Sequence, residues 1–153
     1  MEEALYRAYV KILKEELVPA MGCTEPIAVA YAGALARRTL GTLPQSVDVQ
    51  VSANIIKNVK SVVVPHTGGL RGIAAAAVTG IVAGDAGRGL EVLSAVTEEQ
   101  VARMADYLRD TPIAISPSRS GYIFDIQIRV KGGDHAAFVQ IAGSHTNVIR
   151  VER

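Results

Sequence analysis

The stretch that decides the fold runs from residue 122 to residue 142 and reads YIFDIQIRVKGGDHAAFVQIA. Its first part, 122–130, places apolar side chains at every second position, which predicts a strand with one buried face. The KGGD sequence at 131–134 is typical of a tight hairpin turn. Residues 135–142 then return as a second strand. The stretch therefore predicts an antiparallel β-hairpin.

Further strands and helices are predicted around this hairpin. Alternating or β-branched residues predict strands at 46–51, 60–64, 113–116 and 146–151, with 54–58 as an irregular link between the first two. Helical spacing or Ala-rich composition predicts helices at about 2–18, 26–40, 70–83, 88–94 and 97–109. We therefore expect one α+β domain over residues 1–153, with a mostly antiparallel sheet packed against several helices in two layers.

Three helix ends carry local signals. Pro26 suits the first turn of the second helix, where its missing N–H is harmless, and Gly41 suits the position after the last turn. Thr97 and Gln100 have the spacing of a capping box. These signals fix where the helices should begin and end.

The composition limits the kinds of function. The chain has 153 residues, of which 49% are apolar, and its 16 basic and 15 acidic residues leave a net charge of +1. This balance argues against a nucleic-acid or anionic-membrane surface, and no apolar run is long enough to span a membrane. The acidic N-terminus is unlike a signal peptide, so we expect a cytoplasmic protein. One cysteine forms no internal disulfide and supplies no four-ligand zinc or iron–sulfur site by itself.

The turn that reads MGCTEP at 21–26 is the first candidate for chemistry. Cys23 precedes a helix start, where the positive end of the helix dipole favours a thiolate. It is equally compatible with a small buried apolar residue. Glu25 fits either a general base or a favourable charge in the first helical turn.

Two later segments are more ambiguous. Gly68, Gly69 and Arg71 precede an Ala-rich helix and offer backbone N–H groups and a guanidinium to an anion, or they form only a turn with an exposed arginine. His145 lies in a polar turn and either orients a ligand or belongs to a turn whose side chains bond their own backbone. A metal site formed with His66 and His135 would require the three imidazoles to converge in space.

Residues 19–30, which read PAMGCTEPIAVA, resemble the N-terminal signature of the L-cysteine desulfidase family, which is related to the iron–sulfur L-serine dehydratases. Residues 51–58, 89–93 and 145–147 are similar to later family segments in the same order. The resemblance spans nearly the whole chain, and the Cys-Thr-Glu-Pro sequence is its most specific part.

The resemblance implies a lyase that converts L-cysteine or L-serine to pyruvate and ammonia, with sulfide released from cysteine. It also implies an oxygen-sensitive [4Fe–4S] cluster whose cysteines lie in a C-terminal half, so this chain would be an inactive N-terminal part that needs a cluster-bearing partner. By this resemblance Cys23 would be a thiolate base or nucleophile, and Glu25, from its place beside it, is the second catalytic candidate. The substrate-binding residues would be Thr24, Asn54, Lys57, Asn58, Thr67, Gly68, Arg71, His145, Thr146 and Asn147.

Two other hypotheses remain open. One is a stand-alone regulatory module that binds a small carboxylate with Gly68, Gly69 and Arg71 and has no enzymatic activity. The other is a cysteine-dependent hydrolase that uses Cys23 with His145. The last predicted strand has an unprotected edge, which would allow a second copy of the chain to pair with it.

Overall fold

The computed structural model describes residues 3–8 and 24–153 of the chain. Residues 3–8 are helical, in agreement with the start of the first predicted helix. The rest of that helix and Cys23 lie outside the described residues. None of the helices in the described part is long and apolar enough to cross a membrane.

The elements follow one another in the order helix, strand, three helices with a short 3-10 turn among them, and four strands. Their bounds are α2 Thr24–Leu40, β1 Ser46–Val51, α3 Ala53–Val59, α4 Gly72–Ala83, η1 Ala86–Glu91, α5 Glu98–Asp110, β2 Ile113–Pro117, β3 Asp125–Gly132, β4 His135–Ala142 and β5 Val148–Glu152. The sheet order is β2-β1-β3-β4-β5. β1 pairs with β2 in parallel, and the other three pairs are antiparallel.

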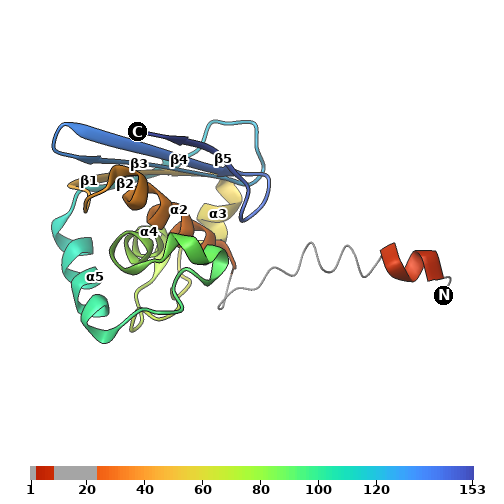
Figure 1. Ribbon diagram of the computed structural model, residues 1–153, viewed down its shortest axis with the longest axis horizontal. Coiled ribbons are helices and arrows are strands. Elements are labelled where there is room, and N and C mark those ends of the chain that lie inside the picture. The colour runs from red at the N-terminus through yellow and green to blue at the C-terminus, as the bar shows by residue number, and fades with distance from the viewer. Residues whose placement is uncertain (1–2, 9–23) are drawn as a thin grey trace.

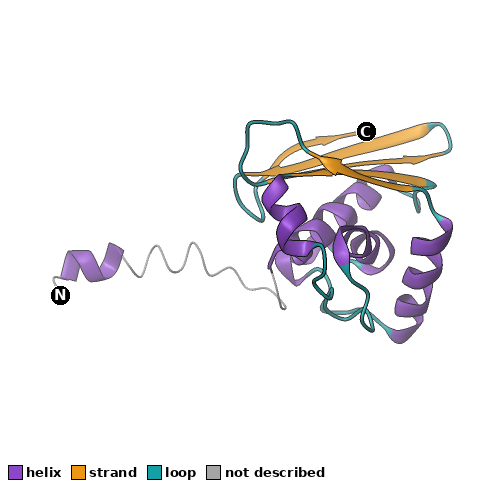
Figure 2. Cartoon of the chain, turned by 180° about the vertical axis from the view of Figure 1, so that it is seen from behind, coloured by secondary structure: helices purple, strands orange, loops and turns teal. Residues whose placement is uncertain are grey.

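The sheet forms one layer and the helices form the other (Figures 1 and 2). β3 and β4 are the hairpin predicted from residues 122–142, although β3 begins at Asp125 rather than at residue 122. The expected α+β class, with a mostly antiparallel sheet packed on helices, is thus confirmed.

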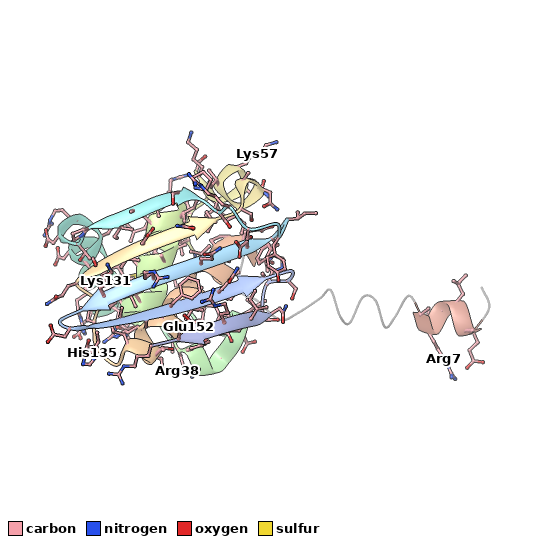
Figure 3. The ribbon with its side chains drawn as sticks, turned by 90° about the horizontal axis from the view of Figure 1, so that it is seen from above. Arg7, Arg38, Lys57, Lys131, His135 and Glu152 are labelled. Atoms are coloured by element: carbon pink, nitrogen blue, oxygen red, sulfur yellow. The ribbon has the colours of Figure 1, made fainter. Side chains whose placement is uncertain are left out.

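The two faces of the sheet differ in character. The face toward the helices is apolar and fully or almost fully buried, with Val47, Val49, Val51, Ile126, Ile128, Val130, Ala137, Val139 and Ile141. The opposite face, called here the outer face, carries polar side chains, and Figure 3 shows Lys131 and Glu152 on it. Phe138 on this face is only 6% exposed because the guanidinium groups of Arg129 and Arg150 each lie 4.9 Å from its ring centroid.

The helical layer is built on a close contact between α2 and α4. A Cβ atom placed on Gly80 would lie 1.8 Å from the carbonyl oxygen of Ala30, and one on Gly33 would lie 2.6 Å from that of Ala77. The two backbones therefore touch at these glycines, and no larger residue fits between them. This contact fixes the position of α2, whose first turn carries Glu25.

The secondary structure predicted for two segments was wrong. Residues 54–58, expected as an irregular link, belong to helix α3, because Ile55 and Val59 lie one helical turn apart and are both fully buried. Residues 60–64, expected as a strand, join no sheet. Val63 forms only an isolated bridge with Arg71, so the valine-rich sequence closes a loop, 63–71, instead of extending the sheet.

The predicted helix ends agree with the structure. Pro26 lies in the first turn of α2, and Gly41 follows its end with φ of 89° and donates its N–H to Arg37 O at 2.9 Å. Thr97 and Gln100 form both hydrogen bonds of the capping box at the start of α5. A third departure is the short helix expected at 88–94, where the structure has the 3-10 turn η1, Ala86–Glu91.

Candidate functional site

The first turn of α2 meets the turn between β4 and β5. The Nε2 atom of His145 lies 4.0 Å from Oε1 of Glu25, and the two side chains are 35% and 30% exposed. This separation is too long for a direct hydrogen bond. It is short enough for one water molecule or one substrate group to hydrogen-bond to both side chains. Thr24 lies beside Glu25 at the helix start and is half-buried. The structure thus brings together two sequence-predicted residues that are 120 positions apart in the chain.

The imidazole of His145 is held by its surroundings rather than by hydrogen bonds from its Nε2 atom. This nitrogen is buried and has no hydrogen-bond partner within the described part of the chain. The ring packs against Phe124, with 4.5 Å between the ring centroids and an interplanar angle of 51°. A buried nitrogen that accepts or donates no hydrogen bond within the protein is usually bound to a water molecule, an ion or a ligand.

The turn that carries His145 is tied at both ends. Gly143 has φ of 84° and donates its N–H to Phe124 O at 3.0 Å. The side-chain amide of Asn147 donates to Ala142 O at 2.9 Å, so this amide is bound within the turn. Thr146, also predicted to contact substrate, is exposed.

The predicted substrate residues of 54–58 lie on α3, which contacts α2. Asn54, Lys57 and Asn58 are all exposed, on the side of α3 opposite to its buried Ile55 and Val59. Figure 3 shows Lys57 projecting away from the sheet. These three side chains therefore face solvent in the free chain.

Thr67, Gly68 and Arg71 belong to loop 63–71, and the side chains of Thr67 and Arg71 make local hydrogen bonds there. The Thr67 hydroxyl is buried, donates to Val64 O at 2.7 Å and accepts from the N–H of Leu70 at 3.0 Å. Arg71 donates to Ser61 O at 3.0 Å. A Cβ on Gly68 would lie 3.3 Å from Val101, which places this loop beside α5.

A buried carboxylate next to the site was missed by the sequence reasoning. Asp125 is 0% exposed, and its side chain accepts four hydrogen bonds, from Ser118, Ser120, Gln127 and Gln140. Asp125 occupies a polar position of the alternating pattern in β3, where a solvated side chain is expected. The nearby polar residues Ser118, Ser120 and Gln127 were the local signal for its partners.

The hydrogen bonds decide the charge of Asp125. Burial alone raises its pKa, because it removes water from the carboxylate. The four side-chain hydrogen bonds oppose this effect and hold the pKa of Asp125 below its ordinary value. The group is therefore an ionised carboxylate at neutral pH, fully surrounded by donors.

The implied [4Fe–4S] cluster does not fit the donor atoms of this chain. Such clusters are held by several cysteine thiolates, and the chain has one cysteine. In the described residues, no three His, Cys, Asp or Glu side chains lie close enough to hold a metal ion. The single cysteine of residues 1–153 therefore cannot hold such a cluster.

The chain is similar to bacterial proteins that carry the family name UPF0597. It is 47% identical over 152 residues to the one from Desulfitobacterium hafniense, 44% over 149 residues to that of Lachnoclostridium phytofermentans, and 40% over 153 residues to that of Treponema denticola. No family model matches the chain. These alignments cover 97–100% of the chain and 35–36% of each relative, so the chain spans about a third of the length of the relatives it matches.

Proposed function

We propose that this chain is the substrate-binding part of a cytoplasmic lyase that eliminates the β-substituent of L-cysteine or L-serine. The observation that carries the proposal is the approach of Glu25 Oε1 to 4.0 Å from the buried Nε2 of His145, a nitrogen that has no hydrogen-bond partner among residues 3–8 and 24–153. The resemblance of residues 19–30 to the desulfidase signature supports the same reaction.

The pair suits a proton transfer at the α-carbon. When a base removes the α-proton, the electrons of the Cα–H bond form the Cα–Cβ double bond, and the Cβ–S or Cβ–O bond breaks. The leaving group departs as sulfide or hydroxide and takes up a proton. The resulting aminoacrylate reacts with water to give pyruvate and ammonia. A carboxylate within reach of the substrate performs such a proton abstraction, and positioned acid–base groups contribute rate factors of about 10²–10⁴.

The two residues have different roles in this proposal. Glu25 accepts the α-proton, and His145 donates a hydrogen bond from Nε2 to the substrate carboxylate. Thr24, at the same helix start, adds a hydroxyl to the pocket. Cys23 contributes a thiol that, by the family resemblance, acts on the substrate. The cluster and its ligands come from polypeptide outside residues 1–153.

The test uses the full-length D. hafniense relative with its matching segment replaced by this chain. The chimera is purified and assayed under anaerobic conditions, with iron and sulfide content measured, and pyruvate is followed with L-serine and L-cysteine as substrates. We expect pyruvate from the cluster-loaded chimera and none from residues 1–153 alone. A chimera that contains the cluster and releases no pyruvate from either amino acid would refute the proposal.

A further inference from the structure

The ends of four strands meet at Asp125. It is the first residue of β3 and pairs with Ala142 at the end of β4. Its backbone exchanges two hydrogen bonds with Ser52, directly after β1: Ser52 N–H donates to Asp125 O at 2.9 Å, and Asp125 N–H donates to Ser52 Oγ at 3.1 Å. Its side chain accepts from Ser118, directly after β2. One residue thus ties together the ends of four of the five strands, β1 to β4, on the side of the sheet that carries the candidate site.

The side chain of Asp125 also organises the segment before it, here called loop 118–124. Ser118 and Ser120 donate to the carboxylate, and their hydroxyls in turn accept from the N–H groups of Ser120 and Tyr122 at 3.2 and 3.3 Å. The loop is therefore folded around this carboxylate. Its last residue is Phe124, the direct neighbour of Asp125.

Phe124 connects loop 118–124 to the turn that carries His145. Its carbonyl oxygen accepts from Gly143, the residue that opens the turn of His145, and its ring packs against the imidazole at 4.5 Å. A loss of order in loop 118–124 would thus release both the ring contact and the start of the turn.

We propose that Asp125 is the positioning residue of the candidate site: by folding loop 118–124 and joining the strand ends, it makes Phe124 hold the His145 ring toward Glu25. The consequence for catalysis rests on the proposed function, whereas the effect on the position of His145 does not. Asp125 lies at the start of β3, its side chain accepts hydrogen bonds from Ser118, Ser120, Gln127 and Gln140, and it is joined to the imidazole through its neighbour Phe124.

The chemistry of the carboxylate predicts how its variants differ. Asp125→Ala removes the acceptor shared by Ser118, Ser120, Gln127 and Gln140, and a buried or part-buried donor left unpaired costs more than its hydrogen bond contributes. Asp125→Asn keeps an oxygen for the serines and Gln127. The amide of Gln140 then turns so that its oxygen accepts from the new NH₂ group. The asparagine variant should therefore preserve the loop, and the alanine variant should not.

The experiment measures the position of the ring directly, in the 153-residue chain. Proton NMR detects the nuclear Overhauser effect between the rings of Phe124 and His145, and hydrogen exchange follows the N–H of Gly143. We expect Asp125→Ala to abolish the Overhauser effect and to speed exchange at Gly143 by about tenfold or more, as for a local opening. Asp125→Asn and the control Asp48→Asn, on the outer face of β1, should retain both.

An Asp125→Ala variant that folds and keeps the Overhauser effect and the Gly143 protection would overturn the proposal. If that variant does not fold, the double variant Ser118→Ala/Ser120→Ala decides: loss of the ring contact supports the proposal, and an unchanged contact overturns it. In the chimera, kcat for pyruvate release should fall with Asp125→Ala and recover with Asp125→Asn. If the wild-type chimera makes no pyruvate, the proposed function fails, and the ring contact still decides the role of Asp125.

Discussion

Replacement of Gly80 by alanine tests the backbone contact on which the helical layer depends. The added methyl group would lie 1.8 Å from the carbonyl oxygen of Ala30, 2.6 Å from its carbonyl carbon and 2.8 Å from its Cα. Because these are backbone atoms, no side-chain rotation relieves the overlap. α2 and α4 must move apart by roughly 1 Å, which opens the core between them.

The expected magnitude follows from two opposing effects. Alanine in a helix interior is favoured over glycine by about 1 kcal/mol. Overpacking costs about 1–3 kcal/mol and occasionally more, and a clash with rigid backbone belongs at the upper end. We expect a net loss of about 2 kcal/mol or more in the free energy of unfolding. With a urea m-value of about 1–3 kcal/mol/M, the midpoint should fall by about 1 M.

Urea unfolding of the 153-residue chain, followed by circular dichroism, measures this change. The matched control is Gly121→Ala, because a Cβ at Gly121 meets no atom within 4 Å. This control should stay within about 0.5 kcal/mol of wild type. Adding Ala30→Gly to Gly80→Ala should not restore stability, since the overlapping atoms of Ala30 are backbone atoms. A Gly80→Ala midpoint equal to that of wild type, with an unchanged m-value, would refute the reasoning.

Three further predictions concern single interactions. Tyr107→Phe removes the hydroxyl that donates to Pro44 O at 2.7 Å, so thermal or urea unfolding should show a loss of about 1 kcal/mol; an unchanged midpoint would contradict this. Thr97→Ala removes one half of the capping box of α5 and should also cost about 1 kcal/mol, whereas the same change at the exposed Thr42 should have little effect. The pKa of Asp125 is lower in the folded chain than in the unfolded chain, so its ionisation stabilises the fold fully above pH about 4, and this contribution is lost as the pH falls toward the folded value. The difference in unfolding free energy between wild type and Asp125→Asn should therefore shrink below pH about 4, and a difference that grows there would show that the sign is wrong.

Much of the fold could be predicted because its signals are local. The alternation in residues 122–142 and the turn at 131–134 specify a hairpin without help from the rest of the chain. Residues 54–64 were misread because their structure depends on distant partners. The valines at 62–64 favour a strand, but only Val64 finds a buried place, and the seven-residue α3 is defined by the burial of Ile55 and Val59 against the core. The parallel pairing of β1 with β2 has no local signal either.

The candidate site could be predicted in part. The sequence identified Glu25 and His145 separately, but their approach to 4.0 Å depends on how α2 lies across the sheet, and that position is set by the glycine contact with α4. Asp125 was missed because its place in the alternating pattern of β3 indicates a solvent-facing residue. Its burial results from side chains of three other segments that surround it, which no spacing in the sequence reveals.

The central claim is that Glu25 and His145 act together on the substrate. The most direct measurement is a double-mutant cycle in the anaerobic, cluster-loaded chimera, with Glu25→Gln, His145→Gln and both changes, scored by kcat/KM for pyruvate release from L-serine. We predict that each single change lowers kcat/KM by about 10²-fold or more, and that the double variant is little worse than either, because the pair works as a unit. An active chimera in which both single variants keep the wild-type kcat/KM would contradict the account.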